Sequence, residues 1–329
     1  MSSLPSLTSI ISRLRMRHLR LLIALHEHGT VQKAADAVAL TQPGATKALG
    51  EIEAMLGAQL FTRTHRGLET TPMGLCAVRY ARLIYTDLAH FHEEMEGMLQ
   101  GHGGRLSVGL IMGAVPLIST ALTRVRALQP AIAIEVVEDT SARLLNLLDR
   151  GRLDVAVCRS RVNQRPHLYD SLDIHDEELA VICHPDNPLT QLAQVSLADL
   201  VDTSWIVYPA NMPMRLLLER EFHEANLQFP LYPIETASAF ASISMLRHDR
   251  DSVALMSVDA AQPFSESGMV ALLPIRLHSR SEPYELVTRK GATLSPATRL
   301  FMQEVASVGN LQADAASHIA AVQTGEDKP

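Results

Sequence analysis

The sequence predicts an α/β protein in which a small helical domain and a long helix precede two α/β subdomains. Three observations lead to this fold class. Two amphipathic helical patterns lie close together in 30–56, an apolar repeat without proline runs from 73 to 99, and strands alternate with helices over 105–309. With 329 residues, of which 47% are hydrophobic and 20% charged, the chain is long enough for two or three domains with real cores.

Two short helices are expected between Thr30 and Gly57. The first pattern has apolar residues at spacings of three and four: Val31, Ala34, Ala35 and Val38. The second continues in the same way: Ala45, Ala48, Leu49, Ile52, Met55 and Leu56. Thr30 and Thr41 can cap the two helices, and Pro43 falls in the first turn of the second. Because the connection around 39–40 is short, the helices must cross sharply, as in a helix-turn-helix.

The outer face of the second helix combines small and polar residues with one base: Thr41, Gln42, Gly44, Thr46 and Lys47. Hydroxyls, amides and an ammonium group can contact base edges and phosphates, and small residues let a helix enter a major groove. A helical hairpin with a solvated face is the alternative interpretation.

A small β-wing is expected next, over 57–74. Leu60 and Phe61 are apolar, basic residues then surround a turn at Gly67, and Leu68 resumes an extended segment. Arg63 and Arg66 at such a tip would contact the sugar-phosphate backbone.

Residues 19–74 resemble the winged helix-turn-helix of the LysR-type transcriptional regulators. The resemblance rests on an ordered series of elements: Ala34-Ala35, Gln42-Pro43, the Glu53–Leu56–Gly57 stretch, Leu60-Phe61-x-Arg63, Arg66-Gly67 and Thr71-x-x-Gly74. It implies a double-stranded DNA operator as partner, contacted by Gln32, Thr41, Gln42, Pro43, Thr46, Lys47, Arg63 and Arg66. The family usually has Ser at the positions of Thr41 and Thr46, often Arg at that of Lys47, and commonly Ala at that of Gly44.

The charge distribution agrees with a DNA-binding head. Residues 1–72 hold eight Lys or Arg against five Asp or Glu, a net charge of +3, whereas the whole chain has −7. The remainder therefore carries about −10 and is expected to do something other than hold DNA. The order of apolar and basic residues at the N-terminus is the reverse of a signal peptide, and no apolar run is long enough to span a membrane, so a cytoplasmic protein is expected.

Residues 73–99 are expected to form one long helix with an apolar seam. A long helix leaving a small domain has little of its own chain to pack on, so a second copy is the expected partner, with packing on its own body as the alternative. The resemblance places the dimerisation helix of the family here, which implies a homodimer or homotetramer. The contacts expected are Tyr80, Leu83, Ile84, Leu88, Phe91 and Met95, and residues 100–104 would form a hinge.

The β-α-β-α-β order from 105 onward predicts a parallel sheet with helices on its faces, and a second such unit follows. Together they resemble the periplasmic-binding-protein-type effector domain of the same family. The expected organisation is a DNA-binding domain at 1–72, a linker at 73–104, subdomain I at 105–171 and 275–311, subdomain II at 172–274, and a tail at 312–329.

A small-molecule effector is expected beyond the carboxyl ends of the strands, near helix N-termini. The candidate residues are Met112, Gly113, Thr140, Ser141, Arg159, Ser160, Pro209, Asn211, Thr236 and Ser238. Helix capping alone explains any single Ser or Thr. Arg159 follows a buried strand, where an unpaired charge is costly, and in family members with aromatic-acid effectors an Arg at this position meets a carboxylate. The expected effector is therefore anionic, an organic or aromatic carboxylate.

Two other classes are less consistent with the sequence. A periplasmic-type solute-binding protein would need a signal peptide and would lack the basic head, and an α/β enzyme fused to a DNA-binding head would need a catalytic constellation. His26 and His28, like His90 and His92, are two residues apart, so a helix directs them away from a common metal. Cys76, Cys158 and Cys183 form no CxxC pair and are expected to be reduced thiols. We expect no enzyme activity, cofactor or metal, and RNA polymerase as a further partner if the protein activates transcription.

Overall fold

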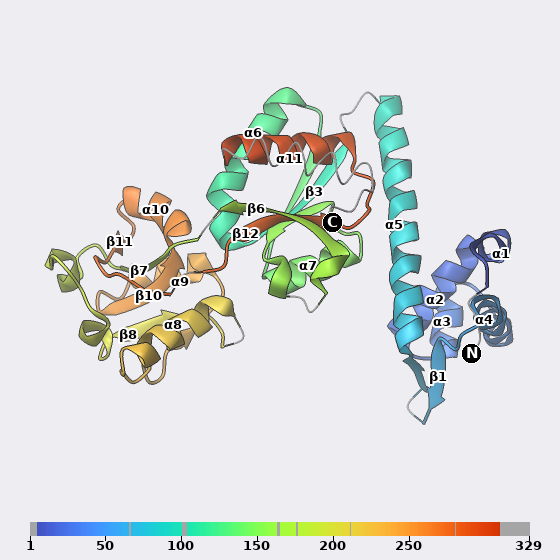
Figure 1. The fold of residues 1–329 in the computed structure, drawn as a ribbon, viewed down its shortest axis with the longest axis horizontal. Helices are drawn as coiled ribbons and strands as arrows, with labels where there is room; N and C mark the ends of the chain where they lie inside the picture. The colour runs from blue at the N-terminus through green and yellow to red at the C-terminus, as the bar shows by residue number, and fades with distance from the viewer. Residues whose placement is uncertain are drawn as a thin grey trace. The chain divides into compact units, whose positions relative to one another are not determined.

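The computed structural model describes residues 5–65, 67–100, 104–162, 165–175, 177–210, 212–279 and 281–309. The chain divides into two compact units, 1–104 with 146–153 and 105–145 with 154–329, and each is described by itself (Figure 1). Among these described residues, no helix is long and apolar enough to cross a membrane.

The first unit opens with a helical head. Its elements are α1 (Leu7–Arg13), α2 (Met16–His28), α3 (Val31–Ala37), α4 (Gln42–Leu56), β1 (Phe61–Thr64) and β2 (Gly67–Thr70). The side chain of Thr30 caps α3, that of Thr41 caps α4, and Gly57 ends α4 in the left-handed conformation, with φ of 66°. A shared core joins α2, α3, α4 and the start of the wing: Leu21, Leu22, Leu25, Ala34, Ala45, Ile52 and Leu60. The sequence analysis proposed no element for the segment that forms α1.

Helix α5 (Pro72–Gln100) follows the wing as one uninterrupted helix and begins one residue earlier than expected (Figure 1). Val78 and Ala81 are buried on it, and α5 packs along α2. Most of the expected hinge, residues 101–103, lies outside the described residues.

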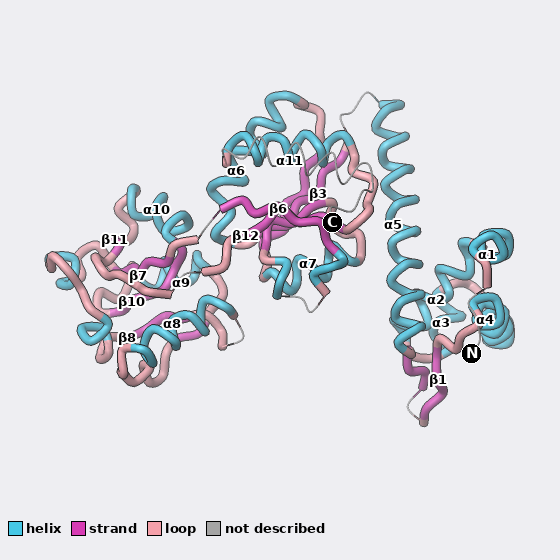
Figure 2. Tube along the Cα trace, viewed as in Figure 1, coloured by secondary structure: helices cyan, strands magenta, loops and turns pink. Residues whose placement is uncertain are grey.

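The second unit contains two mixed sheets (Figure 2). The first has the strand order β4-β3-β5-β12-β6. Its strands are β3 (Arg105–Leu110), β4 (Ala133–Glu138), β5 (Val155–Cys158), β6 (Tyr169–His175) and β12 (Tyr284–Arg289), and its helices are α6 (Val115–Leu128), α7 (Ser141–Asp149) and α11 (Pro296–Val308). Helices α6 and α11 pack against each other, so the last described segment of the chain lies beside an early part of this sheet.

The second sheet has the order β11-β7-β10-β8-β9. Its strands are β7 (Leu179–Cys183), β8 (Ser204–Val207), β9 (Ile234–Glu235), β10 (Ser252–Ser257) and β11 (Ala271–Leu272), and its helices are α8 (Pro213–Glu224), α9 (Ala239–Leu246) and α10 (Val258–Glu266). One core cluster of this subdomain includes Trp205, which packs edge-on against Phe222. Strand β9 is only two residues long.

The parallel pairing predicted from the β-α-β-α-β order holds for β3, β4 and β5, and each sheet also contains antiparallel pairs. Strands β4, β3 and β5 are parallel, but β12 pairs antiparallel with both β5 and β6. The second sheet repeats this arrangement, because β9, β8 and β10 are parallel whereas β7 pairs antiparallel with β10 and β11. Strands β7 and β12 are those at which the chain enters a subdomain from the other one, and this crossing reverses their direction. Strands β6 and β11 and helix α10 were not predicted from the sequence.

Candidate functional site

The exposed face of α4 carries the residues expected to contact DNA. Thr41, Gln42, Pro43 and Lys47 are exposed and Thr46 is half-buried. The Thr46 hydroxyl donates to the carbonyl of Gln42 at 3.0 Å, which leaves its oxygen able to accept. The Lys47 side chain is 81% exposed, with its ammonium 4.0 Å from the Glu51 carboxylate. A contact this exposed contributes little, so Lys47 can turn toward a phosphate or a base at low cost.

The wing is hydrogen-bonded to the turn before α3. The amide of Leu68 donates to the carbonyl of Gly29 at 2.7 Å. Gly67 has a φ of 128°, and a Cβ at this position would lie 2.5 Å from the same carbonyl oxygen, so a side chain is excluded there. Arg63 is exposed on β1, whereas Arg66 lies outside the described residues.

Three residues of the sequence motif hold the wing in place. The Glu53 carboxylate accepts hydrogen bonds from the amides of Leu60 at 2.7 Å and Phe61 at 3.2 Å. The Thr71 hydroxyl donates toward the carbonyl of Leu60 at 3.1 Å and accepts from the amide of Gly74 at 3.0 Å. A Cβ on Gly74 would collide with the carbonyl oxygen of Leu60. The motif spacing is therefore explained by the geometry that joins α4, the wing and α5.

Two side-chain contacts of α2 connect it to the wing and to α5. The ring Nδ1 of His26 lies 2.9 Å from the Thr70 hydroxyl, and Arg82 forms an ion pair with Glu27 at 2.9 Å. Burial, and then the charge of Arg82, lower the pKa of His26 below its usual 6.5. The pKa of the buried His18 is lowered as well, by burial and by Arg17.

An apolar seam runs along the side of α5. It consists of Tyr80, Ile84, Leu88, Phe91 and Met95, which are between 42% and 59% exposed in the single chain. Their spacing of four, four, three and four residues places them on one helix face. Leu83, which was expected to belong to the seam, is half-buried.

The second unit has a cavity at the carboxyl ends of its strands. Its volume is about 500 Å³, and its described lining includes Met112, Gly113, Thr140, Ser141, Arg159 and Ser238 from the expected set. Ser160, Pro209 and Thr236 are not part of this lining, and Asn211 lies outside the described residues. The amide of Ser160 donates to Glu285, and the Thr236 hydroxyl accepts from the amide of Ser238. These two residues therefore serve local structure.

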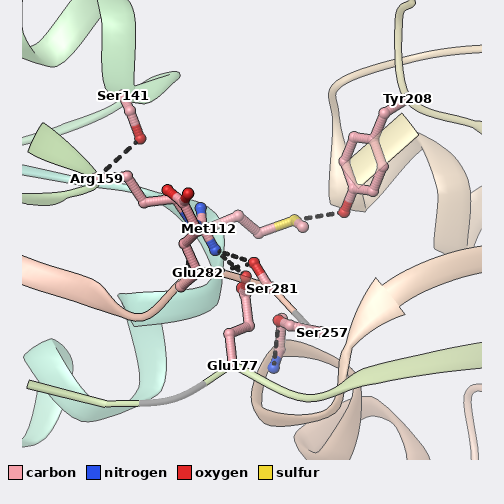
Figure 3. A network of polar contacts seen from close by, with 9 residues as sticks. Met112, Ser141, Arg159, Glu177, Tyr208, Ser257, Ser281 and Glu282 are labelled. Carbon is pink, nitrogen blue, oxygen red and sulfur yellow. Dashed lines mark hydrogen bonds and ion pairs between the residues drawn. The ribbon is translucent and has the colours of Figure 1, made fainter. Parts of the chain in front are cut away.

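Arg159 is paired inside the protein (Figure 3). Its Nη2 forms an ion pair with Glu177 and donates to the Ser281 hydroxyl at 2.6 Å, while its Nε donates to the carbonyl of Glu282 at 2.9 Å. Arg159 is 7% exposed and Glu177 4%. Arg159 is therefore paired within the protein, and its expected contact with an effector carboxylate stays a prediction. Its partners lie on the two segments that join the subdomains, β6 to β7 and β11 to β12.

Several lining residues were not predicted from the sequence: Glu138, Asp139, Glu177, Tyr208, Met212 and Met214. Glu138 is the last residue of β4, and Tyr208 directly follows β8. The rule that ligands bind at the carboxyl ends of strands could therefore have predicted both residues. Glu177 carried no comparable signal. Its carboxylate lies so close to Gly113 that a Cβ there would collide with it.

The buried thiols are unsuited to chemistry. Burial raises the pKa of Cys158 to about 12 and that of Cys183 to about 11, so both stay protonated and unreactive near neutral pH. Within the described part of the chain, no three His, Cys, Asp or Glu side chains gather as a metal site would require.

Family models match most of the chain. The model described as the LysR substrate binding domain matches residues 99–309, and that of the bacterial regulatory helix-turn-helix protein of the lysR family matches residues 16–75. The chain belongs to the LysR family of transcriptional regulators. It is thus a DNA-binding transcription regulator with a C-terminal substrate-binding domain, and the predicted family and fold class are confirmed.

Two curated relatives of this LysR-type regulator are HTH-type transcriptional regulators. The HTH-type transcriptional regulator GbpR of Azospirillum brasilense is 34% identical over 88% of this chain and 84% of its own length. GbpR of Rhizobium radiobacter is 30% identical over 75% of the chain and 82% of its own length. Among solved structures, ArgP from Mycobacterium tuberculosis has a TM-score of 0.65 at 16% identity, covering 90% of this chain and 98% of that one. CbnR bound to its target DNA has a TM-score of 0.58 at 20% identity, covering 90% and 100%; at these identities the likeness concerns the fold.

Proposed function

We propose that this LysR-type regulator binds its operator through α4 and the wing, and that an effector in the cavity of the C-terminal domain controls promoter activity. The observation that carries the first part is the exposed face of α4, where Gln42, Thr46 and Lys47 follow an N-cap at Thr41. Small hydroxyl and amide groups with one cation can follow the floor of a major groove. Gln32, Pro43 and the wing arginines Arg63 and Arg66 complete the proposed contact surface.

The apolar seam of α5 supports a homodimer. Five large apolar side chains, exposed along one face of a single helix, are well covered by the same face of a second copy. A dimer would present two α4 helices to two half-sites of an operator. Pairing of dimers into a tetramer, and contact with RNA polymerase if the protein activates, are further proposals that follow from the family. Because the protein binds DNA, we expect it in the compartment that holds the chromosome.

The cavity supports an effector of small-molecule size, since sites for such ligands typically enclose about 300–1,000 Å³. The proposed contacts among the expected residues are Met112, Gly113, Thr140, Ser141, Arg159 and Ser238. A carboxylate is the effector class expected from the position of Arg159. To bind there, it would have to displace Glu177 from the Arg159 guanidinium or share that guanidinium with Glu177. The internal ion pair therefore weakens the argument for that class.

Sequencing of the DNA that co-purifies with the full-length protein tests the regulator function. We expect a site with two half-sites about one helical turn apart or a multiple of it, bound in gel-shift titrations by the wild type. A head variant with Lys47 and Arg63 both replaced by Ala should lose this binding, while a variant at the exposed Glu224, far along the chain on α8, should keep it. If the protein shows no preferred sequence, the proposed docking is wrong.

A further inference from the structure

The described lining of the effector cavity is acidic. Its ionisable side chains of Asp, Glu, Lys and Arg are Glu138, Asp139, Glu177 and Arg159, three negative groups against one positive. Glu138 and Asp139 follow one another at the end of β4, where both are exposed at the cavity. Asp139 accepts from the amide of Thr140 at 2.7 Å and faces Arg143 at 3.9 Å. The formal charges of these four lining residues sum to −2, which disfavours an anion.

The positive group is already compensated. Arg159 donates to Glu177, to Ser281 and to the carbonyl of Glu282, and both members of the ion pair are more than nine-tenths buried. A carboxylate ligand that took the place of Glu177 would leave that buried carboxylate without its partner, which is costly. A ligand that leaves the pair intact avoids this cost.

Most of the other polar groups in the lining can accept hydrogen bonds from a ligand. Carboxylates such as that of Glu138 can only accept hydrogen bonds when ionised. Tyr208 is only 6% exposed, and its hydroxyl lies 4.0 Å from the sulfur of Met112, a weak contact for a buried phenol. Burial and the nearby Glu177 raise the pKa of Tyr208, so the hydroxyl keeps its proton and can both donate and accept. Thr140 and Ser238 add hydroxyls.

The lining also contains adaptable apolar groups. Met112, Met212 and Met214 line the cavity together with the ring of Tyr208, and Figure 3 shows the Met112 side chain reaching toward Tyr208. Methionine side chains adjust their shape to a carbon skeleton at little cost. The lining thus combines hydrogen-bond acceptors with apolar groups that can contact C–H groups of a ligand.

We propose that the effector is a compact small molecule without net negative charge, which binds by giving several O–H or N–H hydrogen bonds to the side of Glu138 and Tyr208 while the Arg159–Glu177 pair stays closed. This inference rests on the proposed function, because it assigns the ligand of the same cavity. It replaces the carboxylate as the first choice of effector class.

Two matched sets of probes test the ligand class on the full-length protein. One set is an aldohexose, the uronic acid of the same skeleton and the corresponding hexosamine, and the other is benzyl alcohol, benzoate and benzylamine. Calorimetry and the emission of the chain's one tryptophan, Trp205 in the core of the second subdomain, report binding. Within a set, the neutral or amine member should bind at least about tenfold more tightly than the acid, the size expected for one charge-assisted hydrogen bond gained instead of a repulsion. An acid that binds as well as its neutral counterpart overturns the inference.

A variant locates the effect in the cavity. Glu138→Gln preserves the shape of the side chain and removes its charge, and because Glu138 is exposed the fold should tolerate it. We expect this variant to bind the preferred probe about tenfold less tightly. The difference in affinity between that probe and the acid should become smaller. Glu224→Gln, at an exposed carboxylate outside the lining, is the matched control and should change neither. Equal binding by wild type and Glu138→Gln contradicts the proposal.

Operator binding separates the two levels of failure. Gel shifts without any probe test only the regulator function, so a protein that binds no operator refutes the proposed function. A protein that binds its operator but shows no binding of any neutral or amine probe refutes the ligand class alone.

Discussion

The carboxylate of Glu53 accepts a hydrogen bond from the amide of Leu60, seven residues further along the chain, at 2.7 Å. It also accepts a hydrogen bond from the amide of Phe61. One side chain near the end of α4 thus satisfies two backbone donors at the start of the wing. The wing and α4 are thereby held in one geometry, which DNA binding needs if both are to reach the duplex together.

Glu53→Ala should therefore lower both stability and DNA affinity. Loss of hydrogen bonds to a charged acceptor costs about 1.5–3 kcal/mol in the free energy of unfolding, and a loosened wing should bind every DNA sequence less tightly. Thermal unfolding and gel-shift titration measure the two effects. Glu51→Gln, at an exposed carboxylate two residues earlier, is the stability control. If Glu53→Ala unfolds at the wild-type temperature, the wing is held by its other contacts.

Lys47 and Arg63 should behave differently on DNA. If Lys47 reads a guanine, Lys47→Ala should cost about 1–3 kcal/mol at one base pair and relax specificity there. Arg63→Ala should instead weaken all sequences alike and reduce the slope of log K against log salt by about 1. Arg66→Ala should resemble Arg63→Ala. Titrations against a set of operator variants at several salt concentrations distinguish a base contact from a phosphate contact, and two variants with wild-type affinity would exclude the docking.

Two glutamates in the seam of α5 should produce monomers. Leu88 and Phe91 are 48% and 59% exposed in the single chain, so Leu88→Glu combined with Phe91→Glu should leave the fold intact while placing charge in the dimer interface. Light scattering should give the mass of one chain, and half-sites should lose cooperative binding. Ala89→Glu, at an exposed position between the two that lies off the seam, should remain dimeric. A dimeric double variant would assign the interface to another surface.

The head should lose stability as the solution becomes acidic. The folded pKa of His26 lies below its usual 6.5 because of burial and Arg82, so the unfolded chain binds the proton more readily than the folded one. Stability is then fully present above about pH 6.5, the unfolded value, and is lost as the pH falls through the lower folded pKa. His18 should add to this with the same sign. Thermal unfolding from pH 7.5 to 5 should show a smaller decline for His26→Gln than for wild type or for His28→Gln, an exposed neighbour. An unchanged pH profile in His26→Gln would contradict this assignment.

Replacing one member of the Arg159–Glu177 pair should lower the free energy of unfolding more than replacing both. Arg159→Met leaves a carboxylate buried without its partner, which costs about 3–5 kcal/mol, and Glu177→Leu leaves the guanidinium in the same position. The double variant removes both charges and should recover much of the loss. A double-mutant cycle by thermal unfolding gives the coupling between the two residues, and strictly additive losses would show that they do not act as a pair.

The sequence was most informative where local chemistry decides the structure. Thr30, Thr41 and Gly57 act at helix ends through contacts with near neighbours, so their roles could be predicted from spacing alone. The strand order was only partly predictable, because the direction of β12 depends on a connection through the other subdomain. The partners of Arg159 were not predictable, since Glu177 is 18 residues away and Ser281 122.

The position of Arg159 shows that the location of a side chain can be predicted when its partners cannot. The rule that strand ends meet at one sheet edge placed Arg159 and Ser141 at the cavity, where the structure has them. The same rule cannot tell whether a charged group faces a ligand or another side chain, because this depends on which distant segment passes beside it. In this chain both connecting segments pass beside Arg159.

The chain leaves the first subdomain and returns to it at neighbouring points. His175, the last residue of β6, is paired with Tyr284, the first residue of β12, in an antiparallel ladder. The second subdomain is therefore inserted at what could otherwise be a hairpin, and the first subdomain is continuous in space although its sequence is divided. A tight turn joining β6 directly to β12 would give a miniature single-lobed domain, and a foreign lobe could be grafted at the same two points to make a sensor with a different ligand.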